Sequence, residues 1–321
     1  MRAAQLVAPR TWEIVEVEKP APTDTQMLVR LERVGVCGSD KSSFTGVHPP
    51  YPLAPGVSGH EGVGIVEAAP NGTYQEGDRV LLWGFDRGLY QEYVLATTDG
   101  CCIKLPNDAS PVTLLMSQLL GTVIHCFYKL GNVINQDVVV LGQGPVGQLF
   151  NATLRNLGAR RIIGVDTVDF RLEVSPQMGA THVLNPNKCD LAKEIAALTD
   201  GNMADIVVEA IGAEETFNLS SHLLRRNGTL IYFGVPDKEH PEGLMQFKFM
   251  EFFRKEIRIV MSVGPQPLKD YTIAFDWITQ NRLDVAPILT HVLPLEDIQQ
   301  GFEVAFDRPG EEKAVKVLIK F

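Results

Sequence analysis

The sequence has little positive charge, no regular pattern of cysteines and no long uninterrupted apolar run. Its 321 residues include 29 Lys and Arg against 39 Asp and Glu, a formal net charge of −10. Such a chain is a poor partner for nucleic acid or an anionic membrane surface. No uninterrupted apolar run approaches the roughly 18–20 residues that span a bilayer, and the first 20 residues lack the apolar core of a signal peptide. We therefore expect a cytoplasmic protein without nucleic-acid or membrane partners.

The cysteines do not suggest a disulfide framework, because their number is odd and their spacing irregular. They are Cys37, Cys101, Cys102, Cys126 and Cys189. Most fit the role of small buried apolar residues. Only Cys37, in the segment GVCGSD, has neighbours that indicate chemistry.

Two kinds of periodicity divide the chain. Up to about residue 120, short apolar runs at 26–36, 62–69 and 78–85 are separated by turn-forming residues, which is typical of β-strands. A helical pattern at 111–131 follows, and then strands alternate with helices. The expected strands are 137–142, 161–166, 181–185, 204–212, 228–235 and 257–263, and helices are expected at 145–158 and 170–179 among others. This alternation predicts an α/β fold with a doubly wound parallel sheet.

A glycine-rich turn joins the first of these strands to its helix. Gly142, Gly144 and Gly147 give the pattern G-x-G-x-x-G. The first glycine permits a tight turn, the second lets a pyrophosphate approach the backbone, and the third lets the helix pack on the strand. The helix N-terminus also attracts phosphate. By itself the pattern also fits an ordinary tight turn.

The next strand ends in Asp166, 19 residues after Gly147. This is the spacing of an acid that binds ribose hydroxyls, and its charge would repel a 2′-phosphate. We therefore predict NAD rather than NADP as the cofactor. Asp166 could instead cap the following helix. Arg171 could lie over the adenine edge or simply be solvated.

A second signal lies upstream. Cys37 precedes His60 and Glu61, which stand in GHEGVG. Thiolate and imidazole are good zinc ligands, and catalytic zinc has three protein ligands with one open position. Taken singly, these residues also fit a buried thiol, a turn histidine and a surface charge.

The ordered set of motifs resembles a known family. GVCGSD, GHEGVGIVEAAP, EGDRV, the glycine turn and a strand ending in Asp occur in this order over essentially the whole chain. This order is similar to that of the zinc-dependent medium-chain dehydrogenases, which include alcohol, sorbitol and threonine dehydrogenases. The resemblance implies a GroES-like β-barrel catalytic domain at 1–120 and 264–321, and a Rossmann domain at 121–263. It places the active site in the cleft between the two.

The resemblance also implies roles for single residues. Cys37 and His60 match zinc ligands, Glu61 the acid beside the metal, Asp40 the carboxylate that orients the histidine, and Ser39 the first group of the proton relay. The expected cofactor contacts come from the glycine turn, Asp166 and Arg171, to which the resemblance adds two later strand ends and the basic residue Lys316. These are Gly142, Gln143, Gly144, Pro145, Val146, Gly147, Asp166, Arg171, Ala210, Ile211, Gly234, Val235 and Lys316.

Three departures from the family pattern affect the site. Gln118 stands where a third zinc ligand, Cys, Glu or Asp, is usual, so either Gln118 or Glu61 completes the zinc shell, or the metal has been lost. Ser42 replaces a relay histidine. Only ten residues, GFDRGLYQEY, stand where many relatives insert a four-cysteine lobe. We expect one catalytic zinc and no structural zinc.

The expected function is zinc-dependent hydride transfer between NAD(H) and a secondary alcohol or polyol, or the corresponding ketone. The long apolar strand expected at 257–263 would be an exposed edge in a monomer, so we expect a homodimer or homotetramer. Two alternatives remain: a zinc-free quinone or enone reductase, and a non-catalytic nucleotide-binding relative.

Overall fold

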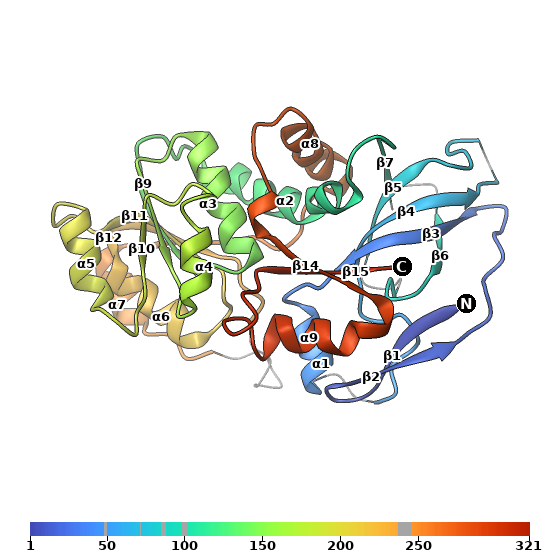
Figure 1. Ribbon diagram of the computed structural model, residues 1–321. Coiled ribbons are helices and arrows are strands. Elements are labelled where there is room, and N and C mark those ends of the chain that lie inside the picture. The colour runs from blue at the N-terminus through green and yellow to red at the C-terminus, as the bar shows by residue number, and fades with distance from the viewer. Residues whose placement is uncertain (48–49, 71, 85–87, 98–101, 237–244) are drawn as a thin grey trace. The chain divides into compact units, whose positions relative to one another are not determined.

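Residues 1–47, 50–70, 72–84, 88–97, 102–236 and 245–321 are described by the computed structural model, whose chain is traced in Figure 1. They form two compact units. Unit 1 comprises residues 1–121, 266–279 and 289–321, and unit 2 comprises 122–265 and 280–288. The sequence-based division assigned all of 264–321 to the catalytic domain. The structure instead groups 280–288, with the buried Val285 and Ile288, with unit 2.

Unit 1 is built on a seven-stranded sheet in the order β14-β15-β3-β4-β5-β7, in which β3 also pairs with β6. Strands β1 and β2 form a separate pair. The strands are β1 (Arg2–Ala8), β2 (Thr11–Glu16), β3 (Gln26–Gly35), β4 (Glu61–Ala68), β5 (Arg79–Trp83), β6 (Tyr93–Thr97), β7 (Cys102–Leu105), β14 (Leu289–Pro294) and β15 (Lys316–Lys320). The helices are α1 (Asp40–Thr45), α8 (Pro267–Thr279), α9 (Ile298–Phe306) and a 3₁₀ turn at Leu295–Asp297.

An aromatic core fixes α9 on this unit. The ring of Phe302 lies 4.9 Å from Trp12, 5.2 Å from Phe44 and 5.6 Å from Tyr90, measured between centroids. These distances are typical of favourable aromatic pairs. All four side chains are buried. The core thereby holds Tyr90, whose hydroxyl points toward the residues around Cys37.

Unit 2 is a six-stranded parallel sheet in the order β10-β9-β8-β11-β12-β13. Its strands are β8 (Asp137–Leu141), β9 (Arg161–Val165), β10 (His182–Leu184), β11 (Ala204–Glu209), β12 (Leu224–Tyr232) and β13 (Arg258–Met261). Helices α3 (Pro145–Leu157) and α4 (Asp169–Val174) lie on one face of the sheet (Figure 1). Helices α5 (Leu191–Leu198), α6 (Glu214–Leu223) and α7 (Phe249–Lys255) lie on the other, and a 3₁₀ turn spans Ala286–Ile288.

The strand order reverses beside β8. From β8 the chain first moves outward to β9 and β10, and then returns to the other side for β11, β12 and β13. In open parallel sheets, ligands bind beyond the carboxyl ends of the strands at this reversal. The glycine turn at 142–147 follows β8 directly and therefore lies at that point.

Several elements are shorter than the sequence predicted, among them β11, which ends at Glu209 rather than at residue 212. Helix α4 ends at Val174 rather than near residue 179, because Pro176 cannot continue the helical hydrogen bonding. Strand β13 covers Arg258–Met261 rather than 257–263. Its partner β12 ends at Tyr232, opposite Met261, so the ladder has no further partner residues.

Helix α2 spans Pro111–Leu130, where the sequence predicted a helix at 111–131. By length and composition this helix passes as a candidate span, and 67% of its most apolar window is buried in the structure. Residues such as Ser117 and Gln118 interrupt its apolar run, so the helix contains no continuous apolar stretch of bilayer-spanning length. A mostly buried core helix has the same composition.

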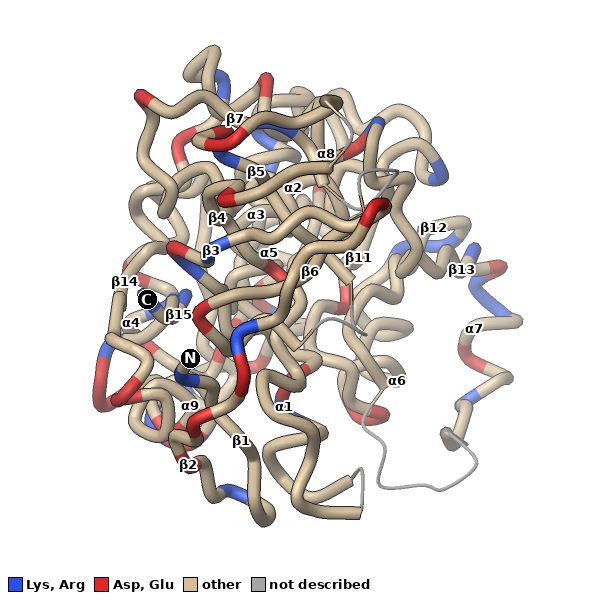
Figure 2. Tube along the Cα trace, turned by 90° about the vertical axis from the view of Figure 1, so that its right-hand side faces the viewer, with Lys and Arg blue, Asp and Glu red and all other residues tan. Residues whose placement is uncertain are grey.

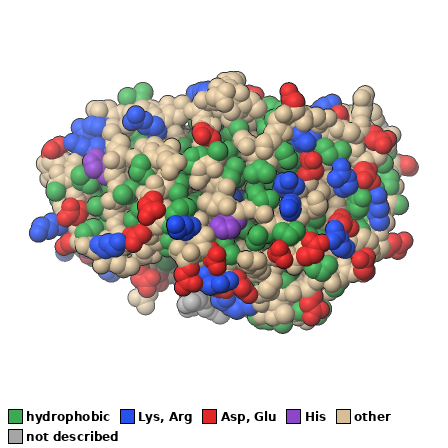
Figure 3. All heavy atoms as spheres, viewed as in Figure 1, with side chains coloured by type: hydrophobic (Ala, Val, Ile, Leu, Met, Phe, Trp, Pro, Cys, Tyr) green, Lys and Arg blue, Asp and Glu red, His purple; other side chains and the backbone are tan. Residues whose placement is uncertain are grey.

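Charged residues of both signs are interspersed along the chain (Figure 2). Acidic and basic side chains are intermixed over the face drawn in Figure 3. That face offers no extended surface of one sign, in keeping with the modest net charge.

Candidate active site

The pairing of β3 with β4 brings the first group of predicted residues together. Val34 near the end of β3 faces Gly62 near the start of β4 in an antiparallel register. Cys37 follows β3 by two residues, and His60 and Glu61 stand at the start of β4. The sheet register therefore places these three residues side by side although 23 positions separate Cys37 from His60.

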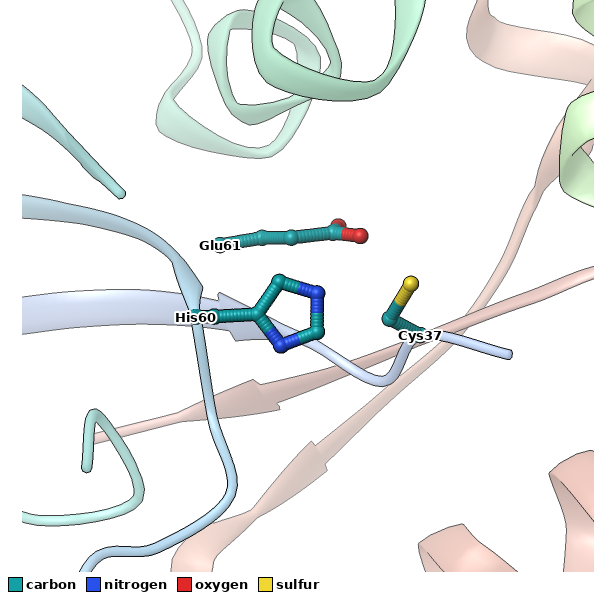
Figure 4. A group of neighbouring side chains, drawn as sticks. All are labelled: Cys37, His60 and Glu61. Carbon is teal, nitrogen blue, oxygen red and sulfur yellow. The ribbon is translucent and has the colours of Figure 1, made fainter. Parts of the chain in front are cut away.

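The side chains of Cys37, His60 and Glu61 converge on one point (Figure 4). The sulfur, a ring nitrogen and a carboxylate oxygen all lie within 4.8 Å of one another. Two ligands bonded to one zinc ion at about 2.0–2.3 Å are separated by no more than about 4.6 Å. The cluster therefore needs little adjustment to hold such an ion. Thiolate and imidazole are also the ligand types that favour zinc over magnesium or calcium.

The carboxylate of Glu61 has one satisfied and one unsatisfied oxygen. Oε2 accepts a hydrogen bond from Lys316. Oε1 is buried, and no residue that the structure describes donates to it. A buried polar atom without a partner is costly, and such atoms mark places where a ligand or ion belongs. The residues present therefore fit a bound cation.

Asp40 ties this cluster together from behind. Its Oδ2 accepts hydrogen bonds from the Cys37 backbone N–H and the Tyr90 hydroxyl, both at 2.9 Å. Its Oδ1 accepts one from Ser58 Oγ at 2.7 Å and lies 3.4 Å from Nδ1 of His60. Asp40 and His60 are both buried. This is the arrangement by which a carboxylate fixes the orientation of a metal-binding imidazole.

The electrostatics of the cluster favour positive charge. Burial by itself lowers the pKa of His60, but the negative charges of Cys37 and Asp40 outweigh burial and raise that pKa well above its usual value. Burial by itself raises the pKa of Asp40, and the nearby His60 outweighs it and lowers that pKa. The groups around Cys37 are thus arranged to surround a cation.

Lys316 lies at this cluster, which differs from the phosphate contact that the family resemblance implied. Its Nζ is 2.7 Å from Glu61 Oε2 and 2.9 Å from the carbonyl of Val36, and the side chain is 1% exposed. The pKa of Lys316, which burial would lower, is raised by the charge of Glu61. Gly35 leaves room for the pair, because a Cβ there would lie 2.5 Å from Glu61 Oε2. A side chain so enclosed has no ammonium to offer a cofactor phosphate.

The two predicted relay serines lie at the start of α1. Ser39 Oγ is 3.3 Å from Nε2 of His60. The Ser42 hydroxyl donates to the carbonyl of Ser39 at 3.1 Å. The main chain thus links the two serines, and Ser39 is the one whose hydroxyl reaches the cluster.

Gln118 on α2 is buried and donates from Nε2 to the Tyr271 hydroxyl at 3.3 Å. The ring of Tyr271 packs edge-on against Trp83, with centroids 5.1 Å apart. Trp83 in turn pairs with Glu61 in the β4–β5 register. Tyr271 and Trp83 thus form a chain of contacts between Gln118 and Glu61.

The remaining cysteines that the structure describes do not belong to the cluster of Cys37, His60 and Glu61. Cys37, Cys102, Cys126 and Cys189 form no disulfide with one another in the described part of the chain. Cys101 lies outside the described residues. Burial raises the pKa of Cys126 to about 11, which keeps this thiol protonated.

The glycines of the turn after β8 have the geometry that their spacing predicted. Gly142 has a φ of +90°, and a Cβ there would lie 2.7 Å from Ile211 Cγ1. A Cβ on Gly147 would lie 1.8 Å from the Gly142 carbonyl oxygen. Around Gly144 only Arg171 Nη1, at 4.0 Å, comes near. Helix α3 then begins at Pro145 and Val146, so its free N–H groups face the open side of Gly144.

Asp166 bridges this turn and the segment before α4. Its Oδ2 accepts from the Gln143 backbone N–H at 2.6 Å, and its Oδ1 accepts from Val168 N–H at 2.8 Å. Arg171 Nη1 lies 4.0 Å from Oδ2. The alternative role as a helix cap is wrong, because Val168 is the N-cap of α4 and no side chain caps it.

Two further strand ends meet beside the turn. A Cβ on Gly234 would lie 2.1 Å from the backbone nitrogen of Gly212, so the chain after β12 touches the chain after β11. The predicted cofactor residues Ile211 and Val235 are half exposed there, and Ala210 N–H donates to the carbonyl of Leu141 at 2.9 Å.

One predicted cofactor residue points elsewhere. The side chain of Gln143 is fully buried and its amide bonds to protein groups beneath the turn. Only its backbone remains at the turn surface. The sequence pattern fixes the backbone at this position but carries no signal for the direction of the side chain.

Comparison with known proteins gives matches in both units. The alcohol dehydrogenase GroES-like domain matches residues 23–107, and the zinc-binding dehydrogenase domain matches residues 145–280. An alcohol dehydrogenase of Cupriavidus necator is 28% identical over 369 positions, covering 100% of this chain and 98% of that protein. An L-threonine 3-dehydrogenase of Idiomarina loihiensis is 25% identical, covering 92% of this chain and 93% of that protein.

Among solved structures, an alcohol dehydrogenase from Thermus sp. ATN1 matches with a TM-score of 0.85 and 26% identity, covering 100% of this chain and 99% of that one. The fold therefore combines a GroES-like β domain with a Rossmann-type parallel sheet.

The two domain matches occur in the order that the motifs predicted and together span more than half of the sequence. The curated relatives match over nearly their full length, so no large domain of theirs is missing. Membership implies zinc and a nicotinamide cofactor, and it makes the protein an oxidoreductase. On these grounds the chain belongs to the zinc-dependent medium-chain alcohol dehydrogenase family.

Proposed function

We propose that this protein transfers a hydride between NAD(H) and a secondary alcohol or polyol, or the corresponding ketone, with one catalytic zinc per chain and no structural zinc. The convergence of Cys37, His60 and Glu61 carries the proposal. Bound zinc would supply a Lewis acid for the alcohol oxygen, and bound nicotinamide would exchange the hydride.

The chain's own residues then have separate tasks. Cys37 and His60 hold the metal, and Asp40 fixes the position of both through its hydrogen bonds. Ser39 Oγ lies 3.3 Å from Nε2 of His60, and we assign it to accept the alcohol proton while its own hydroxyl proton is released. From Ser39 the proton leaves through water and the neighbouring hydroxyl of Ser42.

For the third metal ligand we favour Glu61, whose carboxylate lies within 4.8 Å of the Cys37 and His60 ligand atoms and whose buried Oε1 has no donor among the described residues. Lys316 leaves that oxygen available because it binds Oε2. Gln118 is then a neighbour of the site through Tyr271.

The preference for NAD rests on Asp166. Its carboxylate stands at the end of β9, beside the turn where a ribose would lie. A phosphate on the ribose 2′ oxygen would be repelled there. Arg171, whose Nη1 lies 4.0 Å from Asp166 Oδ2, would then cover the adenine edge.

A homodimer or homotetramer remains our proposal for the assembly. Strand β13 is an edge strand of its sheet, and the described residues in and near it and α7 include several exposed apolar side chains. These are Phe249, Met250, Phe253, Met261 and Val263. Light scattering coupled to size-exclusion chromatography tests this directly. We keep the prediction of a cytoplasmic enzyme that has only small-molecule substrates.

The decisive test combines metal analysis with activity. The purified protein should contain about one zinc per chain, and it should reduce NAD with at least one member of a panel of secondary alcohols and polyols. Cys37→Ala should lose both the zinc and the turnover while still binding NADH. Full turnover without zinc would favour a zinc-free reductase, and NADH binding without any hydride transfer would favour a non-catalytic relative.

A further inference from the structure

A buried polar network lies beneath the glycine turn, between α3 and α4. It consists of the side chains of Gln143, Gln148, Asn151 and Ser175, none of which is exposed to solvent. The surrounding interior is made of apolar side chains such as Val140, Leu149 and Ile163. Four fully buried polar side chains in such a layer need hydrogen-bond partners. Most of their polar atoms find them in one another and in the backbone, whereas Asn151 Oδ1 has no partner among the described residues.

Gln143 connects the network to the turn itself. Its Nε2 donates to the carbonyls of Val140 and Gly142 at 3.0 and 3.2 Å. Its Oε1 accepts from Asn151 Nδ2 at 2.6 Å and from Ser175 Oγ at 2.8 Å. The amide thereby fixes the last residues of β8 just before the tight turn.

Space for this amide comes from β9. A Cβ on Gly164 would lie 2.8 Å from Gln143 Oε1. The glycine thus lets the polar side chain lie flat against the sheet, and any larger residue at this position would displace it.

Gln148 connects the network to α4. Its Nε2 lies 3.2 Å from the Gln143 carbonyl, 2.8 Å from the Arg171 carbonyl and 3.1 Å from Ser175 Oγ. The Ser175 hydroxyl also lies 2.8 Å from the Arg171 carbonyl. Gln148 therefore holds the backbone of Arg171. The single hydroxyl proton of Ser175 can be donated either to Gln143 Oε1 or to the Arg171 carbonyl.

The network thus links the turn, Asp166 and Arg171, which the proposed function assigns to the adenosine half of a dinucleotide. Gln143 belongs to the turn, its backbone N–H binds Asp166, and Gln148 binds the carbonyl of Arg171, to which Ser175 can also donate. Neutral buried hydrogen bonds add little net stability compared with well-packed apolar groups. What they add is directional geometry, since each bond is satisfied in only one arrangement.

We infer that Gln143, Gln148 and Ser175 are positioning residues. They hold Asp166 and Arg171 at the distance from the glycine turn that an adenosine diphosphate group requires. This inference rests on the proposed use of NAD(H). It assigns these residues no contact with the cofactor, because all three side chains are enclosed. Their effect passes through the backbone of the turn and of α4.

The test compares the binding of whole and partial cofactors. The variants are Gln148→Met, Ser175→Ala and Gly164→Ala, and the control is Thr153→Val. Thr153 is buried on α3, the helix that also carries Gln148, and no residue that the structure describes hydrogen-bonds to its hydroxyl. Calorimetry and fluorescence titration would measure the affinities for NADH, ADP-ribose and reduced nicotinamide mononucleotide, and thermal melts would check folding.

Gln148→Met, Ser175→Ala and Gly164→Ala should each bind NADH and ADP-ribose about five- to tenfold more weakly. Their affinity for the mononucleotide should stay within twofold of the wild type, and Thr153→Val should match the wild type for all three ligands. If the variants bind ADP-ribose as the wild type does, or lose mononucleotide affinity equally, the inference is wrong. A wild-type protein that binds neither NADH nor ADP-ribose would instead refute the proposed function.

Discussion

Lys316 and Glu61 form an ion pair at 2.7 Å in which the side chains are 1% and 0% exposed. The two residues come from β15 and β4, which are separated by β3 in the sheet. Glu61 is thereby held beside Cys37 and His60 by a residue that solvent does not reach.

Removing the lysine should destabilise the protein strongly. In Lys316→Met the carboxylate of Glu61 would be left buried without a counter-charge, which typically costs about 3–5 kcal/mol. Urea unfolding of the zinc-free protein measures the loss. The control is Lys320→Met, because Lys320 lies on the same strand but is exposed, and it should change the free energy of unfolding by less than about 0.5 kcal/mol. Glu61→Gln combined with Lys316→Met should recover much of the loss, and a double variant as unstable as the single one would contradict this account.

A methyl group at position 35 should disturb the metal cluster, although Gly35 is not itself a proposed metal ligand. In Gly35→Ala the new Cβ would lie 2.5 Å from Glu61 Oε2, so the carboxylate must move. We expect zinc affinity, measured by competition with a chromogenic chelator, to fall about tenfold or more. The matched control is Gly38→Ala, where a Cβ would meet nothing within 4 Å. Equal zinc retention in the two variants would show that the position of Glu61 does not matter.

Removing the charge of Asp166 should change cofactor choice. Asp166→Asn loses the carboxylate that accepts two backbone N–H groups and that would repel a 2′-phosphate. Fluorescence titration should show NADH binding about tenfold weaker and the preference for NADH over NADPH reduced. Asp169→Asn serves as the control, since that exposed carboxylate pairs with Lys188 on the surface. An unchanged preference in Asp166→Asn would remove this residue from the account of cofactor selectivity.

Cys126 should make stability fall in alkaline solution. Burial raises the pKa of its thiol to about 11, against about 9 in the unfolded chain. Because the folded state favours the protonated thiol, its contribution to stability is intact below pH 9 and is lost as the pH rises toward 11, at about 1.4 kcal/mol per pH unit. Relative to the wild type, Cys126→Ala should therefore lose less stability between pH 8.5 and pH 10.5. If the free energies of unfolding of the two proteins, measured in urea, change in parallel with pH, the pKa of Cys126 is not raised in the folded state.

The geometry of the glycine turn was predictable because its signal is local. Gly142, Gly147 and Asp166 belong to one strand–turn–helix–strand segment, where spacing along the chain determines spacing in the fold. The side-chain direction of Gln143 was not predictable, because the same turn backbone is compatible with a side chain that points into the protein or out of it. It depends on the room above Gly164 and on partners such as Ser175.

The metal cluster required more than local pattern. Spacing alone does not bring Cys37 to His60, because that needs the register of β3 against β4. The family resemblance supplied this juxtaposition. The partner of Lys316 was missed, although a lysine in the apolar run AVKVLIKF indicates a buried charge that must be paired. Only the order of strands in the sheet identifies Glu61 as that partner.

The ion pair between Lys316 and Glu61 also sets an order of events during synthesis. These residues lie 255 positions apart, which at about 5–20 residues per second corresponds to roughly 10–50 s of translation. Throughout that interval the emerging chain already carries Cys37 and His60, but the carboxylate beside them has no ammonium to meet. A growing polypeptide could therefore capture a metal ion early, whereas the enclosed form of the cluster must wait until β15 has joined the sheet.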